Sequence, residues 1–362
     1  MKADALYPEP HSISGERLNV LDGWRAISIL AVLAGHWLPL DRIVPNSNEA
    51  VPATGMAIFF TLSGFLITRF LLQRPEAKPF LIRRLLRIVP LAWSAMLVLY
   101  VFNRSNPDSG QALAANLLFY ANLPPQHLFD GGGHLWSLCV EMQFYAAAAL
   151  LVAVGGRPAL YALPVLALAV TSARIVTGIT INIVTWYRID EILAGATLAL
   201  IYGGKFGPGV RNALARCNFW ALLLVATVCC YFLYTPLAYA RPYAIAALVG
   251  VTLFHSPAFV HKGLTSRPAA YVAEISYALY VFHGMLTETW LGSGDVLEKY
   301  LKRPLLIAAT WLLAHLSTYR VERHFILLAK RLTARTRPVA RTGSPIAEPV
   351  KARASSVGSN GR

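Results

Sequence analysis

Long apolar stretches recur along this chain and are separated by short polar segments. Several approach the roughly 20 apolar residues that a helix needs to cross a bilayer. The pattern predicts an all-α fold, a polytopic transmembrane helix bundle of about ten spans. We expect the spans near residues 24–40, 56–73, 88–102, 135–154, 159–176, 184–202, 217–235, 242–256, 270–291 and 304–328.

The loops between these spans predict the orientation of the bundle. An even number of spans puts both termini on one side. If that side is cytoplasmic, the inner loops and termini carry 21 Lys and Arg and the outer loops carry six. This is the asymmetry of the positive-inside rule, so we predict cytoplasmic N- and C-termini. Residues 112–123 are apolar but too short to cross, and we expect an interfacial or re-entrant segment there.

The chain divides into three parts. Residues 1–17 form a predicted cytoplasmic N-terminal segment, and residues 18–330 form the transmembrane domain. Residues 331–362 are basic and poor in apolar side chains, as is typical of a disordered tail, here a cytoplasmic one.

Composition supports a membrane protein and excludes a separate soluble domain. Hydrophobic residues make up 56% of the chain and charged residues 14%, whereas soluble domains carry about 25% charged residues. The net charge of +15 does not indicate nucleic acid as a partner, because membrane orientation explains the basic loops and tail. The four cysteines lack metal-ligand spacing, so we expect no metal.

Arg25 and His36 are two ionisable residues inside the first predicted span. Eleven residues in a helix bring both side chains back to nearly one face, about 16 Å apart along the axis. Ionisable groups in a span are candidates for function, and histidine is suited to moving a proton. The alternative is that Arg25 reaches lipid headgroups and His36 is an ordinary interfacial residue.

A second cluster lies in HLWSLCVEMQFY, residues 134–145. His134, Ser137 and Glu141 follow an i, i+3, i+7 pattern and share one helix face. A carboxylate two turns into an apolar segment needs a proton or a partner. We expect Glu141 to pair with His36 or His134.

Other polar residues fit either a site or ordinary packing. Arg83, Arg84 and Arg87 precede the third span, where they form a phosphate clamp or a positive-inside belt. Ser63, beside Gly64, either leaves room for a ligand or lets helices approach closely. His283 is a pocket wall or a core residue.

Six segments resemble acyltransferase family 3, the bacterial membrane O-acyltransferases that modify surface and exported glycans. They are LDGWRAISILAVLAGH, FFTLSGFLI, RRLLRIVP, HLWSLCVEMQFY, ISYALYVFH and LSTYRVERHFI, in the family's order. The resemblance implies a ten-helix bundle in the bacterial plasma (inner) membrane. It also implies an acyl-coenzyme A donor, by family frequency acetyl-CoA, and a glycan hydroxyl as the outer acceptor, with envelope glycan synthesis proteins as candidate partners.

The family's functional motifs match particular residues of this chain. Its Arg and His signature falls on Arg25 and His36, and its arginine pair falls on Arg84 and Arg87. Its Trp-Ser-Leu motif begins at Trp136, with the family's carboxylate at Glu141.

These assignments lead to a mechanistic hypothesis. The phosphates of coenzyme A stay at the cytoplasmic face against the arginines, and the thioester threads inward past Ser63. Neutral His36 takes the proton of the sugar hydroxyl, with Glu141 as its orienting carboxylate. An acetyl-histidine intermediate is the variant left open.

The acceptor end of this hypothesis uses four more residues. Trp136 stacks on the acceptor sugar, and His283 lines the acceptor pocket. Ser137 and His134 donate hydrogen bonds to the oxyanion.

A transporter of glycans or small molecules is the alternative function, with the same polar stripe as its permeation path. It predicts paired halves with broken helices, and the sequence shows no internal repeat. A purely structural scaffold is a weaker alternative, because ionisable residues inside spans argue against it. The sequence leaves the acceptor, the acyl group and the oligomeric state open.

Overall fold

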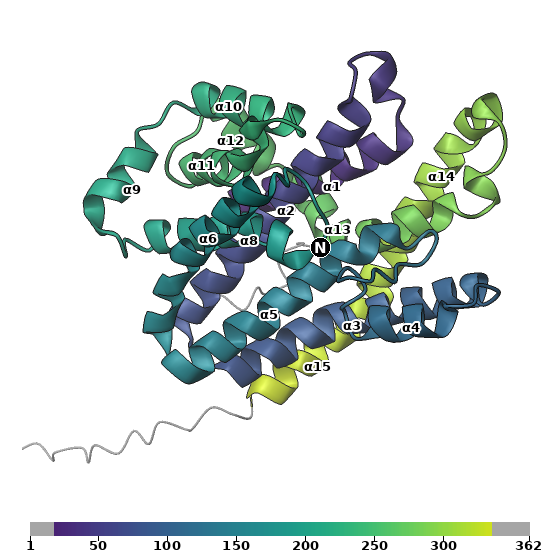
Figure 1. The fold of residues 1–362 in the computed structure, drawn as a ribbon, viewed down its shortest axis with the longest axis horizontal. Helices are drawn as coiled ribbons and strands as arrows, with labels where there is room; N and C mark the ends of the chain where they lie inside the picture. Colours follow the sequence, from purple (N-terminus) through teal and green to yellow (C-terminus); the bar gives the residue numbers. More distant parts are fainter. Residues whose placement is uncertain (1–17, 335–362) are drawn as a thin grey trace, which may run out of the picture.

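A computed structural model describes residues 18–334, and within that range the chain forms helices and no strand. The predicted all-α class is confirmed for this part of the chain. The α-helices are α1 (Asn19–Trp37), α2 (Ser47–Gln73), α3 (Ala77–Asn103), α4 (Ser109–Leu117), α5 (Trp136–Gly155), α6 (Leu163–Thr177), α7 (Thr185–Arg188), α8 (Asp190–Tyr202), α9 (Gly207–Ala215), α10 (Phe219–Tyr231), α11 (Arg241–Phe254), α12 (Ala258–Leu264), α13 (Arg267–Thr287), α14 (Val296–Leu316) and α15 (Arg323–Ala334). Figure 1 shows α3, α5 and α15 side by side along one edge of the bundle, and α2 packs between α1 and α8 near its centre.

Several helices are long and apolar enough to cross a membrane, so the chain is a multi-pass membrane protein. Four qualify directly: Ser47–Gln73, Ala77–Asn103, Gly133–Gly155 and Arg157–Thr177. Two bent pairs raise the number to at most six: Gly207–Ala215 with Phe219–Tyr231, bent by 85°, and Arg241–Phe254 with Ala258–Leu264, bent by 100°. By length and composition the described residues thus contain four to six candidate spans rather than the expected ten.

The other expected spans are helical but broken or interrupted by charge. Residues 184–202 split into α7 and α8, and α8 has only 13 residues and begins with two acids, Asp190 and Glu191. Residues 304–328 are divided by a π-helical turn, Ser317–Glu322, in which Ser317 Oγ donates to Glu322 Oε1 at 3.2 Å. Charged side chains therefore lie inside helices that the apolar pattern predicted as continuous spans.

The short apolar segment matches its prediction, whereas the predicted end of the domain does not coincide with the end of a helix. Residues 112–123 begin on α4, which has nine residues and a length of about 14 Å, too short to cross a bilayer, as predicted. Helix α15 continues to Ala334, so the domain boundary expected at residue 330 falls inside a helix. The expected terminal segments, residues 1–17 and 335–362, lie outside the described residues.

Helix α2 is the centre of the bundle. In its most apolar window 72% of the residues are buried, against 28% in Arg157–Thr177. A Cβ at Gly64 would collide with the backbone of Ile192 in α8, and Gly195 of α8 approaches the backbone of Thr61 in the same way. Small residues that let backbones approach closely are typical of helix packing in lipid. The close-packing interpretation of Gly64 is therefore confirmed.

Candidate active site

A cavity of about 80 Å³ lies between α1, α2, α3, α5 and α13. Three arginines lie on its wall, at what we call the arginine end: Arg25, Arg84 and Arg87. The opposite end is mainly apolar and includes Val32 and Leu138.

The arginine end is built from two helices. Arg84 and Arg87 lie three residues apart on one face of α3, and Arg25 comes from α1. All three are half-buried. The Arg84 guanidinium lies 5.6 Å from the ring centroid of Tyr145, and Arg25 forms an ion pair with Asp22 at 3.4 Å. Guanidinium groups clustered in this way are suited to bind phosphoryl oxygens.

Arg83 does not lie on the cavity wall. Its Nε donates a hydrogen bond to Thr333 Oγ1 of α15 at 2.9 Å. Because neighbouring residues on a helix point about 100° apart, Arg83 faces α15 while Arg84 faces the cavity. The structure thus separates Arg83 from the two arginines with which the sequence groups it.

Glu141 lies on the cavity wall, 5% exposed, and a serine and a tyrosine hold its carboxylate. Ser63 Oγ donates to Glu141 Oε1 at 2.6 Å, and the Tyr145 hydroxyl donates to the same oxygen. The expected pairing of Glu141 with His36 or His134 is wrong. Glu141 lies seven residues inward from His134, about 10 Å along the helix axis, so Ser63 and Tyr145 are nearer partners.

Three histidines meet beyond the apolar end of the cavity, and we call them the histidine cluster: His36, His134 and His283. The ring centroid of His283 lies 5.1 Å from that of His36 and 4.6 Å from that of His134. His283 is 1% exposed, His134 is half-buried and His36 is exposed. Within residues 18–334, no group of three or more His, Cys, Asp or Glu is arranged to hold a metal ion.

Backbone carbonyls orient two of these rings. His283 Nδ1 donates to the carbonyl of Tyr280 at 2.6 Å, and His134 Nε2 donates to the carbonyl of Val281 at 3.2 Å. A donating nitrogen sets which ring nitrogen remains as acceptor in a neutral imidazole. His36 is the ring of this cluster that solvent reaches most readily.

The histidine cluster and the cavity are arranged along the same helices. His36 follows Val32 by four residues on α1, and His283 follows Tyr280 by three on α13. His134 precedes Leu138, a residue of the cavity wall, by four positions. Each histidine therefore lies about one helical turn beyond a residue of the cavity wall. The expected stripe from Arg25 to His36 is present along α1.

Ser137 and Trp136 lie between the cavity and the histidine cluster. Ser137 is fully buried, and its Oγ lies 2.6 Å from the Tyr280 hydroxyl, which donates to the His134 carbonyl. Because a phenol has only one proton, Ser137 donates to Tyr280 and is not free to donate elsewhere. Trp136 is half-buried, and the Arg188 guanidinium lies 5.4 Å from its ring centroid.

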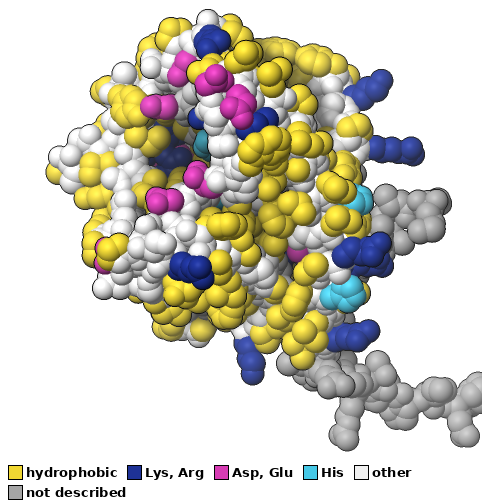
Figure 2. Space-filling model, turned by 90° about the vertical axis from the view of Figure 1, so that its right-hand side faces the viewer, with side chains coloured by type: hydrophobic (Ala, Val, Ile, Leu, Met, Phe, Trp, Pro, Cys, Tyr) yellow, Lys and Arg dark blue, Asp and Glu magenta, His cyan; other side chains and the backbone are white. Residues whose placement is uncertain are grey.

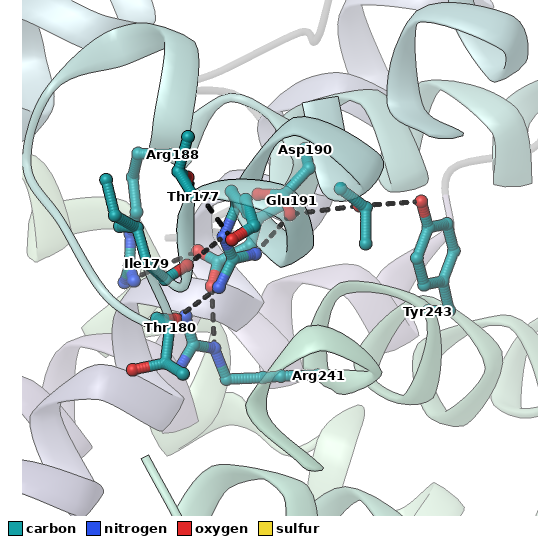
Figure 3. A network of polar contacts seen from close by, with 10 residues as sticks. Thr177, Ile179, Thr180, Arg188, Asp190, Glu191, Arg241 and Tyr243 are labelled. Carbon is teal, nitrogen blue, oxygen red and sulfur yellow. Dashed lines mark hydrogen bonds and ion pairs between the residues drawn. The ribbon is translucent and has the colours of Figure 1, made fainter. Parts of the chain in front are cut away.

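A buried ionic network near Trp136 is absent from the sequence prediction (Figure 3). Its five charged members are at most 2% exposed: Arg174, Arg188, Asp190, Glu191 and Arg241. Arg241 Nε lies 2.8 Å from Glu191 Oε1, Arg188 Nη2 lies 3.4 Å from Glu191 Oε2, and Arg174 forms an ion pair with Asp190. Four of the five charged residues lie inside the expected spans 159–176 and 184–202. Because charged residues inside a span usually pair with one another, their positions were a signal in the sequence that this network exists.

This network joins α6, α7, α8 and α11. Arg174 also donates to the carbonyls of Ile179 and Thr180, in the segment between α6 and α7. The contacts hold that segment against the bundle. Figure 2 shows that the end of the molecule at the right in Figure 1 is hollowed, with acidic side chains around the hollow and histidine and basic side chains inside it.

Comparisons with known proteins point to one family. A family model described as an acyltransferase domain, Acyl_transf_3, matches residues 18–316. The peptidoglycan O-acetyltransferase OatA of Listeria monocytogenes is 27% identical over 352 residues, which cover 83% of this chain and 54% of OatA. YrhL of Bacillus subtilis is 27% identical over 311 residues, covering 73% of this chain and 47% of YrhL.

A third relative has about the same length as this chain. Nodulation protein 10 of Rhizobium leguminosarum is 24% identical over 378 residues, covering 92% of this chain and all of that protein. By contrast, the chain spans about half the length of OatA and YrhL. No solved structure matches the chain.

Proposed function

The chain belongs to the Acyl_transf_3 family of acyltransferase domains, and from this premise we propose that it is a membrane-embedded O-acyltransferase. It moves an acyl group, in our proposal acetyl, from cytoplasmic acyl-CoA to a hydroxyl of an extracytoplasmic or lipid-linked glycan in the bacterial plasma membrane. One observation carries this proposal. A cavity with arginines at one end is followed, one helical turn beyond its other end, by a cluster of three histidines.

The arginine end is suited to the donor. Coenzyme A carries phosphates that are too strongly solvated to enter hydrocarbon, so its nucleotide part remains at the membrane surface. Arg25, Arg84 and Arg87 would bind those phosphates there. The uncharged pantetheine arm then enters the cavity past Ser63, and the thioester comes to lie at the apolar end.

The histidine cluster is suited to proton transfer to and from the acceptor. His36 is exposed, so a sugar hydroxyl can reach it from outside. As the hydroxyl oxygen attacks the thioester carbonyl, the hydroxyl proton passes to His36, and the carbon–sulfur bond breaks. The proton then neutralises the coenzyme A thiolate, which leaves an ester and a free thiol. Positioned proton transfer of this kind typically contributes about 10² to 10⁴ in rate.

Because His283 rather than Glu141 is the neighbour of His36, the roles that we propose for these two residues differ from those expected from the sequence. In our proposal His283, oriented by the Tyr280 carbonyl, supports His36 as its ring neighbour. Glu141 instead orients Ser63 and Tyr145 on the wall that the pantetheine arm passes. Trp136 and His134 remain the proposed contacts of the acceptor sugar.

The test uses purified protein in liposomes with acetyl-CoA labelled in the acetyl group, together with mass spectrometry of envelope glycans from cells that express each variant. We expect thioester cleavage coupled to glycan acetylation, and loss of both in His36→Ala. His261→Ala is the matched control, because His261 is an exposed histidine of α12 and lies away from the cavity.

Two results would overturn the proposal. Acetylation that persists in His36→Ala would remove the histidine from the chemistry. Passage of a glycan or small molecule across the liposome membrane without any thioester cleavage would instead support a transporter.

A further inference from the structure

We propose that Tyr280 is a positioning residue whose ring, together with Phe59, separates the donor cavity from the solvent-exposed His36. This inference rests on the proposed function. Its consequence is that water does not reach the thioester when no acceptor is bound. The barrier therefore prevents hydrolysis of acetyl-CoA, a side reaction that a base open to solvent would otherwise promote.

The two rings lie at the boundary between the cavity and the histidine cluster. Phe59 of α2 and Tyr280 of α13 both line the cavity. Their rings are stacked, with centroids 6.3 Å apart and planes 8° from parallel. The Tyr280 ring also lies 5.4 Å from the rings of both His134 and His283. One ring thus contacts the donor cavity and the histidine cluster at once.

The position of Tyr280 along α13 supports the same conclusion. Ser276, Tyr277 and Tyr280 are the α13 residues on the cavity wall, and Tyr280 is the nearest of them to His283 in the sequence. Tyr277 differs because its hydroxyl donates to the carbonyl of Ile88 on α3 at 2.6 Å. Tyr280 is therefore the last cavity residue of this helix before the histidine cluster.

Hydrogen bonds at its hydroxyl hold the Tyr280 ring in this place. The hydroxyl donates to the carbonyl of His134 and accepts from Ser137 Oγ, which lies 2.6 Å away. Both partners belong to the start of α5 or the turn before it. A tyrosine tethered in this way across two helices loses most of its rotamer freedom, so the ring stays in place until an acceptor binds beside it.

Opening the barrier has a defined chemical outcome. Water entering from the exposed side would lose a proton to His36 as its oxygen attacks the thioester carbonyl carbon. The carbon–sulfur bond would break, and the proton would pass to the thiolate. The products would be acetate and coenzyme A with a free thiol, and no oxidant, reductant or metal is needed.

The experiment measures free thiol released from acetyl-CoA by purified protein in detergent, with no acceptor present. We expect wild-type protein to release thiol slowly and Tyr280→Ala to release it at least about tenfold faster, since a base in place contributes roughly 10² to 10⁴ in rate. Phe59→Ala removes the other half of the barrier and should act in the same direction. Tyr271→Ala is the matched control: it truncates another tyrosine of α13, which contacts His315 and not the cavity, and should leave thiol release unchanged.

Two further variants separate the ring from the hydroxyl and the barrier from the base. Tyr280→Phe keeps the ring and loses its tether, so its hydrolysis rate should fall between wild type and Tyr280→Ala. The double variant Tyr280→Ala with His36→Ala should return to the wild-type rate, because the activated water is lost. A purely structural role for Tyr280 would not predict this reversal.

The outcomes distinguish this proposal from the function on which it rests. Equilibrium binding of labelled acetyl-CoA is measured for each variant. If wild-type protein binds acetyl-CoA but hydrolysis in Tyr280→Ala and Phe59→Ala matches that of Tyr271→Ala, the barrier is refuted and the proposed function stands. If wild-type protein neither binds nor cleaves acetyl-CoA, both are refuted.

Discussion

The contact of α2 with α8 gives the sharpest prediction about stability. Gly64 faces α8 so closely that an added Cβ would have three backbone atoms of Ile192 and Ala196 inside 3.0 Å, a range that real Cβ atoms essentially never show. Backbone atoms cannot rotate away as the end of a side chain can. Gly64→Ala therefore requires the two helices to move apart.

The magnitude follows from this geometry. Overpacking a buried site typically costs about 1–3 kcal/mol, and we expect about 3 kcal/mol because the obstacle is backbone. For a chain of this size, about 2 °C of Tm is lost per kcal/mol, so the Tm should fall by about 6 °C. The donor cavity should also change, because Ser63 is the neighbouring residue and lies on its wall.

The assay is thermal unfolding in detergent, followed with a thiol-reactive dye. Cys139, Cys229 and Cys230 are buried and free, so they become reactive only on unfolding, while exposed Cys217 sets the background. Gly263→Ala is the matched control, since Gly263 is a helical glycine with nothing within 4 Å of an added Cβ. A Tm of Gly64→Ala within about 1 °C of this control would refute the close-packing argument.

Two other predictions concern charge. Arg84→Lys keeps the positive charge but loses the planar guanidinium, so the KM for acetyl-CoA should rise about tenfold. The control Arg216→Lys changes an exposed arginine and should leave this KM unchanged. Equal KM values for the two variants would contradict the role of Arg84 in phosphate binding. Asp190→Asn leaves the buried Arg174 guanidinium without its counter-ion, which should cost about 3–5 kcal/mol of unfolding free energy. Glu298→Gln breaks an ion pair whose acid is 50% exposed and should lower the unfolding free energy by less than about 1 kcal/mol. Denaturation of both variants in detergent measures these losses. Equal losses in the last two variants would show that burial does not govern the strength of these pairs.

Helical periodicity predicted local geometry well. Arg25 and His36 lie on one stripe of α1, and Arg84 and Arg87 share a face of α3, because a continuous helix has a fixed rotation per residue. Arg83 does not join Arg84 and Arg87 on the cavity wall. Its neighbour faces the cavity, but only the packing of α15 against α3 determines that Arg83 meets Thr333.

Pairing between distant segments was less predictable. The sequence indicated that Glu141 needs a partner inside the membrane, and that much holds. It did not indicate that Ser63, 78 residues away, provides the hydrogen bond, or that the three histidines cluster without the acid. The charged residues in 188–191 lie inside an expected span, but the sequence did not indicate that Asp190 and Glu191 pair with Arg174 and Arg241.

The sequence by itself determined the all-helical class, the membrane setting, the family resemblance and the helix face on which each polar residue lies. These properties depend on composition and on the period of a helix, both of which are local. The tertiary structure alone decided which faces meet: the arginines around one cavity, Glu141 with Ser63 and Tyr145, and Tyr280 between that cavity and the histidines. The physical reason is that hydrogen bonds and ring contacts act over a few ångströms, and the distance between residues on different helices depends on how those helices pack.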